Sequence, residues 1–338
     1  MAPPSAATTV VAGPFLAAVG ALEKEKLKLQ ASIVRTLVEC TPGWDGVCAA
    51  DVDVTHVGGA MTNLIFAVTK HDGENADVLI RIYGEGTDAF FVRHEETRLF
   101  ELLSAQNIGV KLLGEFGNGR VEKLLHGATF TYKQMRQPAL SAQIARKMRE
   151  FHQLDVAIDR APRYLSEPRR LLAIARKKCT AAKFQGVVDL DDVAASVEEL
   201  EAVLADVPSP LYTSYNPRGF DLGNHFCEWA FDYHKTVNPH LGDFAKYPTV
   251  EQQRAFCRAY LEAEVVGTGA DSDRLEAPVS DEAVDALRRE ANAYSLASHL
   301  FWALWGFIQA AQSEIDFDFL AYGKCRYDAF KSRVTFKQ

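Results

Sequence analysis

The sequence has few cysteines and none of the spacings that make cysteine useful for cross-linking or metal binding. Six cysteines are scattered over 338 residues, with no Cys-x-x-Cys pair and no Cys/His spacing typical of zinc ligands. A disulfide framework or a zinc site is therefore not expected. A reducing compartment fits this pattern best, so we expect a cytoplasmic protein.

Basic residues are also in deficit, because 37 Lys and Arg stand against 45 Asp and Glu, which gives a formal net charge of −8 at pH 7. A protein whose main partner is nucleic acid normally has a basic bias, so no nucleic-acid partner is expected. The mildly apolar N-terminal run has no basic residue before it, and it therefore does not read as a secretory signal.

Long hydrophobic runs are scarce. The longest uncharged stretch, residues 291–313, has the length of a membrane span, but it contains Asn292, His299 and Gln309. We therefore expect a buried core helix here and no transmembrane segment. Hydrophobic residues make up 48% of the chain, which is ample for a core, and the length suits two domains or one domain with two lobes.

Periodicity divides the chain into a strand-rich part and a helical part. Residues 1–20 are expected to be disordered. Short β-branched runs predict antiparallel strands at 51–59, 62–70 and 77–84, and two more within 111–127. Helical spacing predicts helices at 22–37, 91–107, 144–156, 167–183, 190–205, 250–266, 281–313 and 317–332. The predicted fold is α+β and two-lobed, with an N-terminal lobe at 21–125 and a helical C-terminal lobe at 126–338.

Two features of the strand-rich part suggest phosphate binding. The loop GGAMTN, residues 58–63, lies between two strands, where glycines leave backbone N–H groups free for phosphate oxygens, although an ordinary hairpin turn explains it as well. Arg81 lies in an apolar strand, where a cation is costly unless paired or ligand-bound. The next helix offers Glu95 and Glu96, of which Glu96 faces inward better. A surface salt bridge is the alternative.

Aromatic residues of the helical part suggest a site for a cation. Trp302 and Trp305 are three residues apart and share a helix face, and Tyr233 is a candidate to join them. Such a cluster can hold an ammonium group through its ring faces. A stripe of core residues explains the two tryptophans as well.

Together these motifs resemble the choline/ethanolamine kinase family, which has a protein-kinase-like fold. GGAMTNLIF is similar to its nucleotide loop and VLIRIYG to its phosphate-arginine strand. NPRGFDLGNHFCEW is close to a family signature almost letter for letter, and FWALWGFIQA with EIDFDFLAYGKCRYDAF resembles its C-terminal helices. The similarity covers roughly residues 45–335 in the same order. It implies a strand-rich nucleotide-binding lobe and a helical substrate lobe.

The resemblance also implies roles for individual residues, with ATP as the co-substrate bound between the lobes. The nucleotide residues are Gly58, Gly59, Thr62 and Asn63 over the phosphates, Arg81 on the phosphates, Glu96 orienting Arg81, and the hinge at Lys123 and Leu125 next to Glu122 at the adenine. The ammonium group of choline or ethanolamine would lie among Tyr233, Trp302 and Trp305, with Glu228 supplying negative charge. Asp221, with Asn224, would brace the catalytic loop. A homodimer is also implied, since members commonly dimerise.

One part of the family pattern is missing. The family places a His-x-Asp-Leu loop followed by Asn, and a strand ending in Asp-Tyr-Glu-Tyr, before the quoted signature, and these supply the base and the Mg²⁺ ligands. None of the nine histidines begins such a loop. The helix at 191–210 matches the one before the loop, and Tyr212 matches the end of the metal strand. A few dozen residues are therefore absent between Leu211 and Tyr212, and no catalytic or metal-binding residue can be assigned.

Two functions follow from this pattern. One is the ATP-dependent phosphorylation of choline or ethanolamine, the first step towards the phospholipid head groups. The other is a catalytically inactive variant or pseudokinase that binds nucleotide, amino alcohol or an active paralogue. An aminoglycoside-type phosphotransferase shares the fold but gives no reason for Trp302 and Trp305. The aromatic set suits choline, but the same tryptophans appear in relatives that prefer ethanolamine, and EIDFDFL resembles ethanolamine kinases weakly. The break itself has three explanations: an omitted segment, a splice or gene-model variant, or a true pseudokinase.

Overall fold

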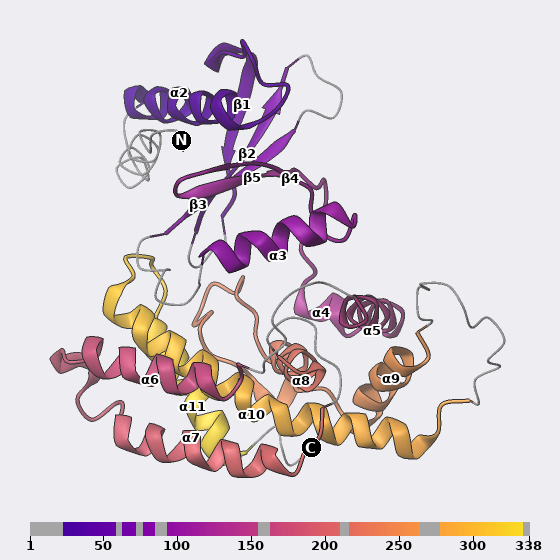
Figure 1. Ribbon diagram of the computed structural model, residues 1–338. Helices are drawn as coiled ribbons and strands as arrows, with labels where there is room; N and C mark the ends of the chain where they lie inside the picture. Colours follow the sequence, from indigo (N-terminus) through magenta and orange to yellow (C-terminus); the bar gives the residue numbers. More distant parts are fainter. Residues whose placement is uncertain are drawn as a thin grey trace. The chain divides into compact units, whose positions relative to one another are not determined.

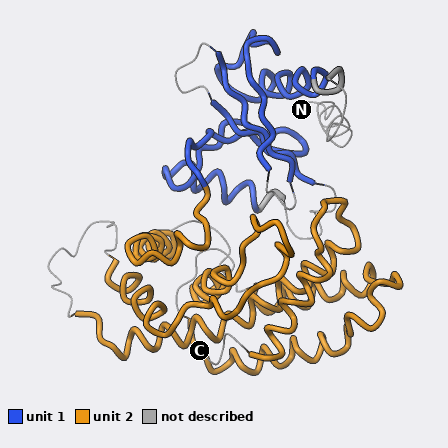
Figure 2. Tube along the Cα trace, turned by 180° about the vertical axis from the view of Figure 1, so that it is seen from behind, with its two compact units in different colours: residues 1–128 blue, residues 129–338 orange. Residues whose placement is uncertain are grey.

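A computed structural model describes residues 23–58, 63–71, 77–84, 93–154, 163–209, 216–263 and 278–333. The chain forms two compact units, Met1–Ala128 and Thr129–Gln338 (Figure 2). The sequence places the lobe boundary after residue 125, and the structural division falls after Ala128. The expectation of disorder for residues 1–20 and the junction at Leu211–Tyr212 lie outside the described residues.

Unit 1 is built on a five-stranded sheet whose hydrogen-bonded neighbours are all antiparallel, in the order β1-β2-β3-β5-β4. Its elements are α2 (Glu23–Cys40), a 3-10 turn (Ala49–Asp51), β1 (Val52–His56), β2 (Asn63–Lys70), β3 (Val78–Tyr83), α3 (Arg93–Ala105), β4 (Leu112–Phe116) and β5 (Gly119–Lys123). The predicted antiparallel strands and the two predicted helices are confirmed. Because β5 pairs with β3, residues some 40 positions apart become neighbours on one face of the sheet.

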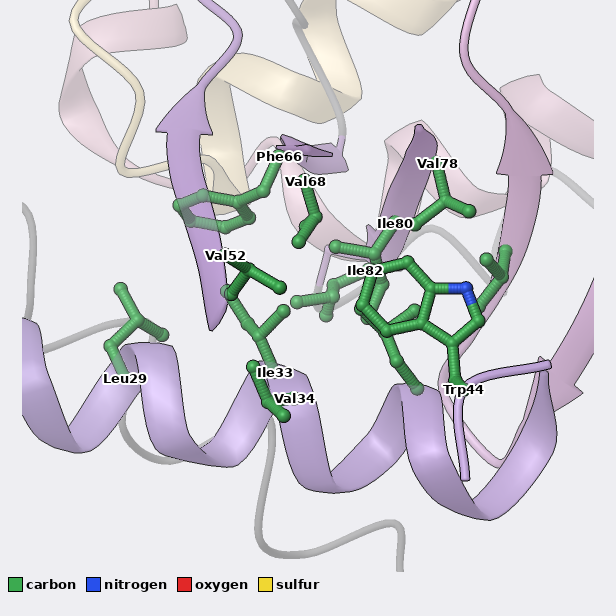
Figure 3. Packing of buried hydrophobic residues seen from close by; sticks show 12 residues of the cluster. Leu29, Ile33, Val34, Trp44, Val52, Phe66, Val68, Val78, Ile80 and Ile82 are labelled. Atoms are coloured by element: carbon green, nitrogen blue, oxygen red, sulfur yellow. The ribbon is translucent and has the colours of Figure 1, made fainter. Parts of the chain in front are cut away.

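The apolar face of this sheet packs against α2 (Figure 3). Alternation along β3 buries Val78, Ile80 and Ile82 on this face and leaves Leu79, Arg81 and Tyr83 on the other. Helix α2 contributes Ile33 and Leu37, which lie four residues apart and are fully buried. The core cluster comprises Leu29, Ile33, Val34, Leu37, Trp44, Val52, Phe66, Val68, Val78, Ile80, Ile82 and Val121. One face of β3 is thus fixed by packing, and the other is left for polar chemistry.

Unit 2 is helical in its described residues and is organised around one long helix, α10 (Figure 1). Its helices are α4 (Tyr132–Met135), α5 (Pro138–His152), α6 (Ser166–Lys178), α7 (Leu190–Ala205), α8 (Arg218–Glu228), α9 (Val250–Leu261), α10 (Asp281–Gln312) and α11 (Phe319–Ser332), with 3-10 turns at Ala182–Phe184 and Phe244–Lys246. Helix α10 packs against α6, α7, α8, α9 and α11.

The expectation of a buried core helix at 291–313 is confirmed, because nearly every residue of α10 from Glu290 to Gln309 is buried. In the part of the chain that the structure describes, no helix combines the length and apolarity needed to cross a membrane. Helix α8 was missed by the sequence analysis. Its signals were Pro217 just before the helix start and the apolar pair Leu222 and Phe226, four residues apart.

Close packing of α8 on α10 depends on Gly223. A Cβ atom at this position would lie 2.5 Å from the carbonyl oxygen of Ala291 and 2.6 Å from the amide nitrogen of Ser295. Both atoms belong to backbone, so relief requires moving a whole helix. Alanine gains up to about 1 kcal/mol of helix propensity over glycine, but overpacking costs about 1–3 kcal/mol or more. The steric effect is expected to win.

We therefore predict that Gly223→Ala lowers the free energy of unfolding by about 2 kcal/mol, measured by urea denaturation. Gly127→Ala is a matched control, because a Cβ atom there would meet no atom within 4 Å. If the Gly223→Ala protein is as stable as the parent, α8 and α10 can move apart to accommodate the methyl group at little cost in free energy.

Candidate functional site

The polar face of the sheet in unit 1 carries two arginines joined by one carboxylate. The strand register places Arg81 opposite Arg120, and like charges in this position repel. Glu122 lies two residues along β5 from Arg120 and therefore on the same face. Its Oε1 accepts hydrogen bonds from Arg81 Nε at 2.8 Å and from Arg120 Nε at 2.7 Å. Glu122 thus holds the two cations together.

Glu96 completes this network from α3. Its Oε1 accepts from Arg120 Nη1 at 2.9 Å, and the guanidinium of Arg120 lies 4.2 Å from the ring centre of Phe100. Two cations are thereby matched by two carboxylates. The structure places Glu122 on Arg81 and Glu96 on Arg120, and the role of Glu96 in orienting Arg81, which the resemblance implied, stays a prediction. Arg120 was missed, although its alternation with Glu122 in GRVEK was a visible signal.

Burial and charge act in opposite directions on Glu122. Burial raises the pKa of its carboxyl, but the hydrogen bonds and charges of Arg81 and Arg120 outweigh burial and leave the pKa below its usual value. The side chain of Arg81 is 23% exposed, against 5% for Glu122. Arg81 is thus held on one side and open to solvent on another, which suits a guanidinium that grips phosphate oxygens with two donors.

The lowered pKa of Glu122 predicts an acid-sensitive contribution to stability. A depressed folded-state pKa stabilises the fold above the unfolded value near 4.5, and this stabilisation is lost as pH falls through the folded value. At pH 6, Glu122→Gln should lower the free energy of unfolding by about 2 kcal/mol, less than a fully buried pair would cost, because Arg120 keeps Glu96 and Arg81 is partly exposed. The difference from the parent should shrink towards pH 3.

Urea denaturation of both proteins between pH 3 and pH 6 measures this effect. Glu39→Gln, which changes an exposed carboxylate of α2, is the control and should leave the profile unchanged. A Glu122→Gln protein that differs from the parent by the same amount at both ends of this range would contradict the assignment.

The remaining nucleotide candidates are only partly described. Gly59 and Thr62 lie outside the described residues. A Cβ atom at Gly58 would meet no atom within 4 Å, so no crowding there requires glycine. Asn63 is the first residue of β2 and pairs with Tyr83 of β3. Lys123 is the last residue of β5, and its backbone N–H donates to the carbonyl oxygen of Lys111. Leu125 follows β5 and is 64% exposed. The nucleotide roles of these residues stay predictions.

In unit 2, side chains from α10, α11, the segment after α8 and the segment before α11 form one aromatic cluster. Its members are Phe231, Tyr233, Trp302, Trp305, Phe317, Phe319 and Tyr322. Trp302 and Trp305 meet edge to face with ring centres 5.3 Å apart, and Trp305 meets Tyr322 in the same way at 5.9 Å. Tyr233 reaches the tryptophans through Tyr322, at 6.5 Å. The three predicted aromatic residues therefore belong to one cluster, and Tyr322 is the missed link.

Asn224 positions the edge of this cluster. Its Oδ1 accepts hydrogen bonds from the indole Nε1 of Trp302 at 2.9 Å and from Ser298 Oγ at 2.8 Å. Both donors come from α10, so Asn224 on α8 fixes the indole plane across the helix contact. In the described residues Asn224 thus orients Trp302, a role the sequence analysis did not foresee.

Glu228 has two partners of its own. Its Oε2 accepts from the hydroxyl of Tyr233 at 3.0 Å, and its Oε1 accepts from Nη2 of Arg326. The side chain of Arg326 is fully buried, and its guanidinium lies 4.1 Å from the ring centre of Phe231. The expected negative charge is therefore present but is neutralised by a buried cation. Arg326 was missed, although a basic residue inside an apolar helix face was visible in KCRYDAF.

Asp221 is paired with a histidine of α5. Asp221 Oδ2 lies 3.1 Å from His152 Nε2, and His152 Nδ1 lies 2.6 Å from the hydroxyl of Tyr260. His152 and Asp221 line one cavity of about 620 Å³ with Phe130, Gln143, Ile144, Lys147, Met148 and Phe151. Ile144, Met148, Phe151 and His152 thus form a face of α5 that lines this cavity. The bracing role of Asp221 stays a prediction.

His225, another polar residue of the signature, is structural. Its ring stacks on Phe256 with centres 4.9 Å apart and accepts from Trp229 Nε1 at 3.3 Å. Burial lowers the pKa of His225 to about 4, so the imidazole is neutral at neutral pH.

Magnesium, which the family uses, needs several oxygen ligands in near-octahedral geometry. Within the described ranges, no three or more His, Cys, Asp or Glu side chains gather in a way that could hold a metal ion. No magnesium ligand is therefore assigned among the described residues, although a magnesium ion on nucleotide phosphates needs only one or two protein carboxylates.

A five-stranded antiparallel sheet in unit 1, followed by a helical unit 2, is the element pattern of the protein-kinase-like fold. An ethanolamine kinase of Plasmodium vivax has this fold, with a TM-score of 0.72 and 21% identity over 92% of this chain and 91% of that one. The family model described as Choline/ethanolamine kinase matches residues 54–211 and 211–331. The chain belongs to the choline/ethanolamine kinase family.

Curated relatives agree with this placement. The chain is 34% identical to "Probable choline kinase 2" of Arabidopsis thaliana, over 91% of this chain and 93% of the relative. It is 32% identical to "Choline/ethanolamine kinase" of Mus musculus, over 85% of this chain and 82% of the relative.

The comparisons also bear on the missing segment. The family match falls into two parts that meet at residue 211, where the sequence analysis places the break. The Arabidopsis alignment covers 347 positions, whereas 91% of 338 residues is about 308, so about 39 aligned positions have no residue in this chain. Both observations support the absence of a segment of a few dozen residues.

Proposed function

We propose that the reaction of this protein is the ATP-dependent phosphorylation of choline or ethanolamine, the first step in making phospholipid head groups, carried out in the cytoplasm. The observation that carries the proposal is the aromatic cluster. Within a chain of the choline/ethanolamine kinase family, Tyr233, Trp302 and Trp305 belong to one chain of ring contacts, and Glu228 accepts a hydrogen bond from Tyr233. Rings in this arrangement attract an ammonium group through their faces.

The nucleotide would bind to the polar face of the sheet in unit 1. Arg81 offers an exposed guanidinium edge to the phosphates while Glu122 fixes its other edge. Pre-orientation matters because phosphoryl transfer depends on positioning and on charge stabilisation more than on covalent chemistry. The homodimer that the resemblance implies stays a prediction.

A second candidate function is binding without turnover, and a specific observation favours it. The family supplies its base and its metal ligands from the segment before the signature, and this segment is absent between Leu211 and Tyr212. A chain without these groups loses most of the stabilisation of the transition state. It keeps the aromatic cluster and Arg81, so it would still bind the amino alcohol and the nucleotide.

One pair of measurements separates the two candidates. The purified protein is assayed for magnesium-dependent ATP turnover with choline and with ethanolamine, and binding of each ligand is measured in parallel. Turnover that requires an amino alcohol supports the kinase, and binding without turnover supports the second candidate. Absence of both binding and turnover would contradict the two together.

A further inference from the structure

The aromatic cluster already contains a cation of the protein itself. The side chain of Arg326 is fully buried, and its guanidinium lies 4.1 Å from the ring centre of Phe231 and 5.4 Å from that of Tyr322. Its Nε also donates to the hydroxyl of Tyr322 at 3.2 Å. Two rings of the cluster are therefore engaged by a resident positive charge before any ligand arrives.

Arg326 also neutralises the carboxylate on which a bound ammonium would depend. Glu228 accepts from Arg326 through one oxygen and from Tyr233 through the other. Because the side chain of Glu228 is 26% exposed, it is reachable from solvent. An incoming cation nevertheless meets a pair with no net charge rather than a free anion.

Asn224, at the edge of the cluster, is also engaged. Asn224 Oδ1 already accepts from Trp302 and Ser298. A primary ammonium has three N–H donors and is strongly hydrated, so it needs several acceptors to replace its water. A quaternary ammonium donates no hydrogen bond and needs only ring faces. The partly exposed indole of Trp302 offers such a face.

We propose that Arg326 is a specificity-determining residue: by neutralising Glu228, it makes the aromatic cluster select the quaternary ammonium of choline over the primary ammonium of ethanolamine. The inference rests on the proposed function, since it takes the cluster as the amino-alcohol site. The preference for choline is the opposite of what the weak resemblance of EIDFDFL to ethanolamine kinases indicates.

Binding, rather than turnover, tests this inference on the full chain. Tryptophan fluorescence is titrated with ethanolamine, N-methylethanolamine, N,N-dimethylethanolamine and choline. The dissociation constant should fall with each added methyl group, to a total of about tenfold between ethanolamine and choline. Ethanolamine binding as tightly as choline would overturn the inference and leave the proposed function standing. If neither binds, the inference and the amino-alcohol part of the proposed function both fail.

A variant tests the role of Arg326 itself. Arg326→Met keeps a long apolar side chain in the buried space and frees Glu228, so the preference for choline over ethanolamine should fall by about fivefold or more. Lys324→Met is the matched control on the same helix, because the side chain of Lys324 is 42% exposed and pairs with Asp328. It should leave the preference unchanged.

Tyr233→Phe keeps the inference testable if Arg326→Met does not fold. This change removes one hydrogen bond to Glu228 without disturbing the buried cation. It should shift the preference in the same direction by a smaller factor, about twofold. A preference that stays constant in every folded variant, with choline still favoured, would show that Arg326 does not set it.

Discussion

Inserting a relative's missing segment between Leu211 and Tyr212 will raise the rate of choline phosphorylation by about 10³-fold or more. The segment would restore the aspartate that deprotonates the hydroxyl and the two side chains that hold magnesium on the phosphates. Because these groups act on charge that develops in the transition state, their joint loss affects the rate far more than binding. The dissociation constant for choline should therefore change by less than about tenfold.

The design uses the relative's residues between the positions that align with Leu211 and Tyr212, at most about 39 by the length of the Arabidopsis alignment. A matched insert of the same length, with the catalytic-loop aspartate changed to asparagine, separates chemistry from folding. Steady-state rates are measured for the printed chain and for both inserts. If the printed chain phosphorylates choline as fast as the full insert, the missing segment does not carry the catalytic groups, and another base must be sought among the residues present.

The sequence predicted the elements of this fold well, because their patterns are local. The period-two alternation of β3 and the apolar face of α2 are set by neighbouring residues, and both appear in the structure as predicted. Helix α8 escaped prediction for a physical reason. Its turn residues and dense polar side chains resemble a loop and obscure the weak signals of Pro217 and of the Leu222 and Phe226 pair, whereas in the structure the helix packs closely on α10 at Gly223.

The candidate sites were predictable in composition but not in their charge pairing. The sequence analysis named Arg81, Glu122 and Glu228, but it did not pair Glu122 with Arg81 and it did not name Arg326. Glu122 meets Arg81 only because β5 lies beside β3, and Arg326 meets Glu228 across 98 positions of chain. Such pairs depend on strand order and helix packing, which no spacing in the sequence reveals. The substrate preference proposed above follows from one of these pairs, so it could not be derived from the sequence.

Glu290→Ala will lower the free energy of unfolding of unit 2 by about 4 kcal/mol. Glu290 of α10 is 5% exposed and accepts from Arg218 Nη2 at 2.8 Å and Nε at 3.0 Å. It also accepts from the hydroxyl of Ser209, which in turn accepts from the backbone N–H of Gly219 at 3.1 Å. One carboxylate thus fastens residues on both sides of the break in the family pattern.

The size of this effect comes from the charge left behind. The side chain of Arg218 is 15% exposed. Burial alone would lower its pKa, but the hydrogen bond and charge of Glu290 outweigh burial and raise it. Arginine cannot shed its proton to escape an apolar site, so without Glu290 the guanidinium stays charged, poorly hydrated and unpaired. Ser209 loses its acceptor at the same time, which adds about 1 kcal/mol.

Urea denaturation of three variants distinguishes the charge effect from a general loss of contacts. The double variant Arg218→Met with Glu290→Met removes both charges and should recover most of the loss, to within about 1 kcal/mol of the parent. Glu201→Ala, which breaks the exposed pair with Arg169, should cost less than about 1 kcal/mol. If Glu290→Ala lowers the free energy of unfolding by no more than Glu201→Ala does, Glu290 does not hold the two sides of the break together. The insertion experiment would then need stabilised flanks, because the ends that receive the segment would not be fixed.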